Sequence, residues 1–121
     1  TPLYSSAASD VYKRQTLNEP TFVEASRALA ASGVRAQTAF DGRLDFISLR
    51  LLGRVFAKPE RAVIRRTLDR ALGEYEGDPA AAQSLLTVGA SRVGADLPAI
   101  ELAAWTLVAS QVMNLDESLT K

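Results

Sequence analysis

Apolar residues recur every three or four positions along most of the chain, and this spacing predicts helices. No segment shows the sustained alternation of apolar and polar residues, rich in valine, isoleucine and threonine, that is typical of strands. The pattern divides into five predicted helices, which cover residues 18–33, 41–52, 59–75, 79–88 and the stretch from 96 onward. We therefore expect an all-α chain that folds as a small bundle of about five helices.

The first predicted helix has a capping signal at its start and a glycine at its end. Asn18 is the expected cap, Pro20 lies in the first turn, where a missing amide costs nothing, and Gly33 is expected to end the helix. Glu24 and Arg27 are expected to face solvent. The residues that helical spacing places on the inward stripe are Phe22, Ser26, Leu29 and Ala30.

The second and third predicted helices are separated by a glycine and a proline. Asp41 is the expected cap of the second helix, and Gly53 is expected to end it. The third begins at Pro59 and has Glu60 close to the positive end of the helix dipole. The third helix also carries the most regular apolar stripe of the chain, made of Ile64, Leu68, Ala71, Leu72 and Tyr75.

The fourth predicted helix is short. Asp78 followed by Pro79 combines a capping residue with a proline at the first helical position. The helix is expected to stop at Gly89, and its apolar residues are Ala82, Leu85 and Leu86. Across the chain, the residues expected to form the core are Phe22, Leu29, Ile64, Leu68, Leu72, Leu86, Trp105 and Val108.

The last predicted helix is capped by Asp96 and carries apolar residues around most of its circumference. Such a helix is either buried in a core or inserted in a membrane. About 14 residues separate Glu101 from Asp116, several of them polar, whereas a bilayer requires ~20 apolar residues. We therefore expect a buried core helix and no membrane span.

Residues 1–15, TPLYSSAASDVYKRQ, have neither a helical period nor an apolar run. Their two basic residues, Lys13 and Arg14, are at the wrong end for a signal peptide. The segment resembles the translated sequencing-adaptor peptide found at the ends of metagenomic open reading frames. We therefore expect it to be a disordered, adaptor-derived segment, and expect the natural protein to begin further upstream.

Composition excludes several kinds of chemistry. The chain has no histidine and no cysteine, which rules out a Ser-His-Asp relay, thiolate catalysis, thiolate or imidazole metal sites and a Cys-x-x-Cys-His haem motif within these residues. Its 14 basic and 14 acidic residues balance, so that no overall field attracts nucleic acid or an anionic membrane. We expect no catalytic, cofactor-binding or metal-binding residue in this chain.

The sequence GASRVG, residues 89–94, has the glycine spacing of a phosphate-binding loop but lacks the lysine that meets the phosphates. No predicted strand precedes it. Ser91 within it also differs from a nucleophile elbow, which has the pattern G-x-S-x-G. We interpret the segment as a helix stop followed by a turn.

Four arginines, Arg61, Arg65, Arg66 and Arg70, form a cationic band on the third predicted helix. Such a band can contact phosphates in a nucleic acid. However, Asp69 interrupts the band, and no aromatic residue alternates with the arginines. We therefore expect a solvated helix face, with a protein contact as the first alternative and no nucleic-acid partner.

Asp116 and Glu117 are neighbouring carboxylates near the end of the chain. On a helix they point about 100° apart, which is unsuitable for sharing a proton or a metal ion. We interpret them as surface or capping residues. Together with Asn114 they form a candidate interaction or capping group, because polar side chains there can hydrogen-bond the end of a neighbouring helix.

Three strings carry a resemblance to a known family. They are LNEPTFVEASRALA at residues 17–30, YEGDPAAAQSLLTVGAS at 75–91 and ELAAWTLVASQVMNLDESLTK at 101–121. Together they resemble the C-terminal domain of unknown function, of the PSD type, of planctomycete-type cytochrome-domain proteins, over roughly residues 17–121. The chain departs from the family at GRVFAKPE, residues 53–60, where members tend to have Gly-Arg followed by a Pro-Thr turn.

Full-length members of that family are large, typically exported, and carry an N-terminal cytochrome c-like domain. The resemblance therefore implies that residues 16–121 are a helical domain at the C-terminus of a larger, exported or periplasmic protein, in which any haem belongs to the upstream part. We expect a non-catalytic helical module that packs against the upstream domains of the same protein. The alternative is a domain that helps to close a redox or hydrolytic active site supplied by those domains.

Overall fold

The computed structural model describes residues 20–87 and 96–120, and within them the side chains of residues 23–87 and 96–114. The described residues form five helices and no strand. The helices are α2 (Pro20–Ala36), α3 (Phe40–Leu52), α4 (Lys58–Gly77), α5 (Pro79–Leu86) and α6 (Ala99–Thr120). The fold is an all-α bundle, as the apolar spacing predicted.

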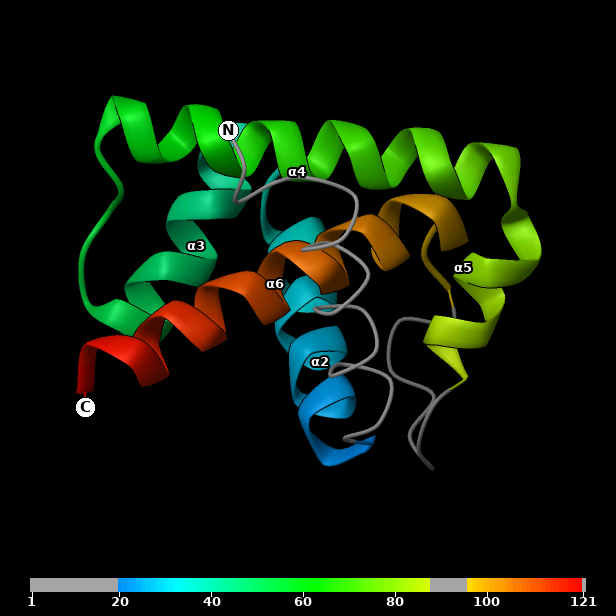
Figure 1. The fold of residues 1–121 in the computed structure, drawn as a ribbon, viewed down its shortest axis with the longest axis horizontal. Coiled ribbons are helices and arrows are strands. Elements are labelled where there is room, and N and C mark those ends of the chain that lie inside the picture. Colours follow the sequence, from blue (N-terminus) through cyan, green and yellow to red (C-terminus); the bar gives the residue numbers. More distant parts are fainter. Residues whose placement is uncertain (1–19, 88–95, 121) are drawn as a thin grey trace.

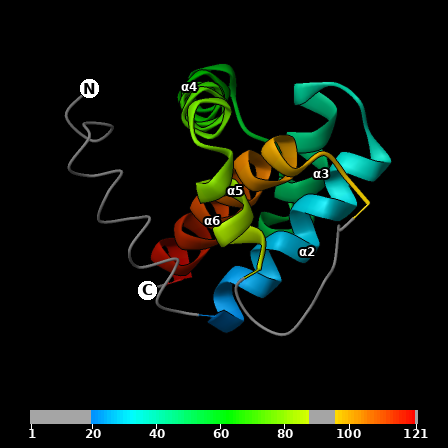
Figure 2. The ribbon, with the colours of Figure 1, turned by 90° about the vertical axis from the view of Figure 1, so that its right-hand side faces the viewer.

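Helix α6 is the centre of the bundle and contacts each of the other four helices. It lies between α4 on one side and α2 on the other, with α3 and α5 completing the surround (Figures 1 and 2). All nine residues from Leu102 to Ser110 are buried, as expected for a helix that is apolar on nearly every side. Among the described residues, no helix combines the length and apolar character needed to span a bilayer.

The expected core residues lie as follows. Ile64, Leu68, Trp105 and Val108 are buried, with between 0% and 5% of their surface exposed. Leu29, Leu72 and Leu86 are partly buried and pack against the core. Phe22 is part of α2, but its side chain lies outside the described residues.

Small residues allow α2 and α6 to pack closely. Ser26 and Ala30 on α2 and Ser110 on α6 are fully buried. The Ser110 hydroxyl donates to Ser26 Oγ at 2.9 Å, and the Ser26 hydroxyl donates to Met113 Sδ at 3.3 Å. Both buried hydroxyl donors therefore have an acceptor within the interface, which avoids the cost of an unpaired polar group.

Several predicted helix ends are wrong. Helix α2 continues past Gly33 to Ala36, and Gly33 lies against α3, where an added Cβ would be 3.4 Å from Ile47. Asp41 lies inside the first turn of α3, whose cap is Ala39. Helix α6 begins at Ala99, and Asp96 forms an ion pair with Arg35 instead of capping it.

Other predicted ends are confirmed. Gly53 ends α3 in the left-handed conformation, with φ of 72°, and its amide donates to the Leu49 carbonyl at 3.2 Å. The Asp78 carboxylate caps α5 by accepting a hydrogen bond from the Ala81 amide at 3.2 Å, with Pro79 in the first turn. The predicted cap Asn18 and the predicted stop Gly89 lie outside the described residues.

Candidate functional site

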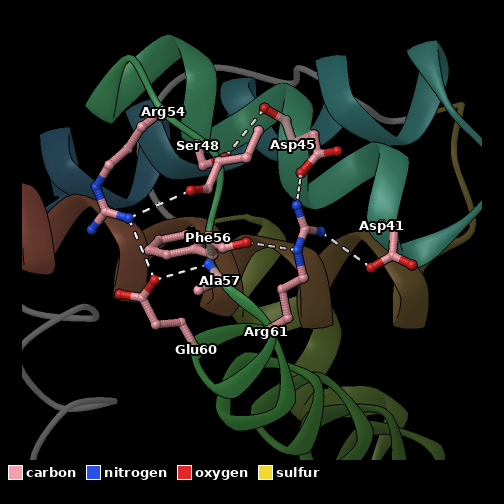
Figure 3. A network of polar contacts seen from close by, with 9 residues as sticks. Asp41, Asp45, Ser48, Arg54, Phe56, Ala57, Glu60 and Arg61 are labelled. Atoms are coloured by element: carbon pink, nitrogen blue, oxygen red, sulfur yellow. Dashed lines mark hydrogen bonds and ion pairs between the residues drawn. The ribbon is translucent and has the colours of Figure 1, made fainter.

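The connection between α3 and α4 carries a network of polar contacts centred on Arg61 (Figure 3). Arg61 Nε donates to the Phe56 carbonyl at 2.8 Å, and Nη1 donates to Asp41 Oδ1 at 3.1 Å. Nη2 forms an ion pair with Asp45. This hydrogen bond to Asp45 is the main cause that raises the pKa of Arg61 above its ordinary value, against the opposing effect of burial. One guanidinium thus joins α4 to two turns of α3 and to the loop between them.

The first turn of α4 holds a second part of this network. The Glu60 carboxylate accepts a hydrogen bond from the Ala57 amide at 3.0 Å and pairs with Arg54 at 3.4 Å. The Ala57 hydrogen bond is the main cause that lowers the pKa of Glu60, followed by Arg54. The Arg54 guanidinium also lies 5.3 Å from the centre of the Phe56 ring. Glu60 therefore satisfies an amide at the helix start and lies at the positive end of the helix dipole.

The α3–α4 network has the chemistry of a structural joint. Asp41 and Asp45 face Arg61, and Glu60 faces Arg54, so each carboxylate of the network has a cationic partner. A general acid near neutral pH requires a carboxyl group with a raised pKa, whereas the pKa of Glu60 is lowered. Among the described residues, no group of three or more potential ligands is placed to hold a metal ion.

Two further arginines bind the ends of helices, and the sequence did not identify either as important. Arg27 was expected to face solvent, but it is 1% exposed, and its Nη1 donates to the Leu86 carbonyl at the end of α5 at 2.7 Å. Arg43 Nε donates to the Gln37 carbonyl, just after α2, at 2.7 Å. Arg43 also forms an ion pair with Glu101 of α6. A cation at the C-terminal end of a helix satisfies free carbonyls and complements the helix dipole.

The arginine band of α4 is divided by these contacts. Arg61 belongs to the α3–α4 network, and Arg65 pairs with Asp69 at 3.3 Å while its guanidinium lies 4.9 Å from the centre of the Phe40 ring. Arg66 and Arg70 are exposed. Because Arg61 and Arg65 are engaged within the domain and Arg70 is not without a partner either, the band does not form a uniform surface for phosphates.

The candidate interaction group near the end of α6 is only partly described. Asn114 is half-buried on α6. Asp116 and Glu117 belong to the same helix, but their side chains lie outside the described residues. The loop GASRVG, including Ser91, also lies outside them.

An open hollow lies at the other end of α4, where α4, α5 and α6 meet, and it has a volume of ≈ 650 Å³. Its floor contains Tyr75, Leu85 and Leu107, which are between 2% and 6% exposed. Burial, with a smaller contribution from the charge of Glu74, raises the pKa of Tyr75 to about 12, so the phenol stays neutral below that pH. The residues that line the hollow are Gly73, Glu74, Tyr75, Gly77, Asp78, Ala81, Ser84, Leu85 and Leu107.

The sequence predicted Tyr75 and Leu85 as apolar stripe residues but gave no indication of a hollow between them. The hollow forms because three helices separated in sequence converge there, which a single-helix pattern does not contain. Its volume is within the range of pockets that bind small ligands or side chains of a partner. No protein-family model, curated protein or solved structure matches the chain.

Proposed function

We propose that this domain is a non-catalytic helical module that packs against neighbouring domains of a larger protein. The observation that carries the proposal is the open hollow between α4, α5 and α6, which has an apolar floor. The hollow is a concave surface with an apolar base, and concave surfaces of this size are where proteins bind ligands or side chains of a partner. A segment of a neighbouring domain can bind there by filling the hollow.

The polar contacts of the domain also favour a structural role. The carboxylates of the α3–α4 network face arginines, and Arg27 and Arg43 bind helix ends. These groups stabilise the fold and leave little capacity for acid–base chemistry. The resemblance to a C-terminal domain of exported cytochrome-domain proteins supplies a context for the neighbouring domains. In that context, haem would belong to the upstream part of the parent protein.

Hydrogen exchange on the parent protein tests the proposal. The intact source gene is sequenced upstream of residue 16 and expressed, and the amide exchange of residues 16–121 is compared between this chain alone and the parent protein. We expect residues 73–85 to exchange at least about tenfold more slowly in the parent, because docking covers the hollow. Residues 26–34 of α2 serve as the internal control, since they are already buried by α6. Equal exchange at residues 73–85 in the two proteins, or a source gene that encodes no further domain, would refute the proposal.

A further inference from the structure

Two large apolar side chains are exposed on the described part of the chain, and both lie at the end of α3. Leu49, in the last turn of α3, is 52% exposed, and Val55, in the loop that follows, is 47% exposed. Between them the chain turns at Gly53, whose amide donates to the Leu49 carbonyl at 3.2 Å. Apolar residues scattered singly over a surface need no explanation, so the feature to explain is that both lie at one turn.

The same segment is basic. Between Asp45 and Glu60 the sequence contains three cations, Arg50, Arg54 and Lys58, and no carboxylate. The two flanking carboxylates each already pair with an arginine. Arg50 and Lys58 form no ion pair with any residue that the structure describes. The positive charge of the segment is therefore only partly offset within the domain.

Both arginines of this segment are held over phenylalanine rings. The Arg50 guanidinium lies 3.9 Å from the centre of the Phe46 ring, and the Arg54 guanidinium lies 5.3 Å from that of Phe56. Figure 3 shows Arg54 beside Phe56 and Glu60. A guanidinium that is stacked on a ring still has the N–H groups at its edges available for a carboxylate. It also loses less conformational freedom on binding than a freely moving side chain.

The α3–α4 network anchors the backbone that carries these side chains. Arg61 Nε donates to the Phe56 carbonyl at 2.8 Å, and the Glu60 carboxylate accepts from the Ala57 amide at 3.0 Å. These contacts lie on the inner side of the loop and hold it against α4. The exposed side chains are therefore presented on backbone that is already fixed, which lowers the entropy cost of binding a partner.

We propose that the surface formed by Leu49, Arg50, Arg54 and Val55, which we call the α3 corner, binds an acidic protein segment in which carboxylate side chains flank an apolar one. The apolar side chain packs on Leu49 and Val55, and a carboxylate pairs with Arg50. Arginine clusters are a recurring means of recognising acidic segments, and arginine forms paired hydrogen bonds with carboxylates. In Figure 1 this corner lies at the left of the molecule and the hollow beside α5 lies at the right. The inference therefore adds a second contact surface and does not depend on the proposed function.

An anionic membrane surface is the other partner that combines negative charge with apolar material. Segments that recognise anionic lipids typically contain about 4–8 lysines and arginines close together. The segment between Asp45 and Glu60 has three, and the charges of the whole chain balance. These observations favour an acidic protein segment over a lipid surface.

Two peptides test the charge requirement on the intact 121-residue chain. The first is N-acetyl-Glu-Leu-Glu-Val-Glu-amide, and the matched control has glutamine in place of each glutamate, which keeps the shape and removes the charge. Binding is followed through the amide resonances of Leu49, Gly53 and Val55 in ¹⁵N-edited NMR spectra. We expect the acidic peptide to shift these resonances with a dissociation constant of about 1–5 mM, and the glutamine peptide to bind at least about fivefold more weakly.

Substitutions at exposed positions separate binding from folding. Arg50→Gln removes the charge that no described carboxylate offsets, and Leu49→Ala removes half of the apolar pair. Each should weaken binding of the acidic peptide at least about threefold, while the circular dichroism spectrum and the urea midpoint change little. The matched control is Arg66→Gln, an exposed arginine of α4 outside the corner, which should leave binding unchanged.

The other results would overturn the proposal. These are equal binding of the two peptides, equal binding by the wild-type chain and Arg50→Gln, and absence of shifts up to about 10 mM acidic peptide. Vesicles of phosphatidylserine and phosphatidylcholine provide the comparison with lipid. If they shift these resonances and the acidic peptide does not, the corner binds a membrane surface instead. Protection of residues 73–85 in the parent protein is measured separately, so the docking proposal for the hollow stands or fails independently.

Discussion

The two ends of α4 differ in how their charged residues interact with the helix dipole. At the start, near the α3–α4 connection, Glu60 lies at the positive end of the dipole and Arg61 joins α4 to α3. At the other end, beside α5, Glu74, Glu76 and Asp78 lie at the negative end, next to an open hollow. Figure 1 places these ends on opposite sides of the molecule.

The difference indicates that the two ends of α4 have different roles. Charges at the first end complement the dipole and neighbouring residues, so they stabilise the fold. At the second end, Glu74 and Glu76 lie near the negative end of the dipole of α4, Asp78 caps α5, and Gly73 lowers helix stability further. Features that weaken a fold locally are expected at functional sites. This contrast leads us to assign stability to the first end of α4 and binding to the second.

Truncating core side chains is expected to have the largest effect on the free energy of unfolding. Trp105 is 2% exposed, and its ring centre lies 5.8 Å from that of Phe40, on the side of α3. We expect Trp105→Ala to lower the free energy of unfolding by about 3–5 kcal/mol, measured by urea unfolding followed by circular dichroism. Leu107→Ala, at the floor of the hollow, should cost about 2 kcal/mol, because a side chain beside open space leaves a smaller cavity. An unchanged urea midpoint for Trp105→Ala would show that this residue does not belong to the core.

Removing Arg61, the central arginine of the α3–α4 network, tests whether the first end of α4 stabilises the fold. Arg61→Met keeps much of the aliphatic volume but removes hydrogen bonds to Phe56, Asp41 and Asp45. We expect a loss of about 1.5–3 kcal/mol, the range for hydrogen bonds to charged groups. Arg66→Met on the same helix is the control, and because Arg66 is exposed its effect should stay within about 0.5 kcal/mol. Equal losses in the two variants would mean that the network does not hold α3 and α4 together.

The burial of Tyr75, at the second end of α4, can be tested by measuring stability at alkaline pH. The pKa of its phenol is about 12 in the folded chain and near 10.0 when exposed, so burial of the neutral phenol stabilises the fold fully below pH 10. This stabilisation is lost as pH rises from 10 towards 12. We expect the wild-type chain to lose about 2 kcal/mol more stability than Tyr75→Phe between pH 8 and pH 11.5.

The remaining tyrosines, Tyr4 and Tyr12, are present in both proteins, so the comparison isolates Tyr75. At pH 8 the two proteins should have nearly equal urea midpoints, because the hydroxyl that Tyr75→Phe removes has no partner among the described residues. A wild-type chain that loses no more stability than Tyr75→Phe at high pH would show that Tyr75 is exposed to solvent.

The sequence predicted the helices well because their signals are local. The stripe of Ile64, Leu68 and Tyr75 repeats with the period of a helix, and the pair Asp78–Pro79 and the glycine at 53 mark ends through their own backbone preferences. These features depend on residues within one or two turns of each other, so they can be recognised without knowing the tertiary structure.

The incorrect predictions all depend on contacts distant in sequence. Gly33 looked like a helix stop, yet it lies within α2 and faces Ile47 of the next helix. Arg27 looked like a solvent-facing residue, yet it is buried because the end of α5, 59 residues later, lies beside it. The hollow likewise requires α4, α5 and α6 to converge. Periodicity identifies which face of a helix is apolar, but it does not identify which helix end will meet a charged side chain.

The smallest expected effect compares two glutamates at opposite ends of α4. Because the pKa of Glu60 is lower in the folded chain than its ordinary value of 4.5, its ionised form stabilises the fold above pH 4.5, and this stabilisation is lost as pH falls through the lower, folded value. At pH 7, Glu60→Gln should lower stability by about 0.3–1 kcal/mol, the usual size of a dipole interaction in the first turn. It should also flatten the loss of stability below pH 4.5.

The matched change at the other end, Glu76→Gln, removes a negative charge from the negative end of the dipole and should raise stability by a similar amount. Urea midpoints of the two variants and the wild-type chain, measured at pH 7 and in low salt, provide the comparison, since added salt screens both effects. If both variants shift the midpoint in the same direction, the charges at the two ends of α4 do not play opposite roles. Opposite shifts would show that the carboxylates at the second end are maintained against the stability of their own helix.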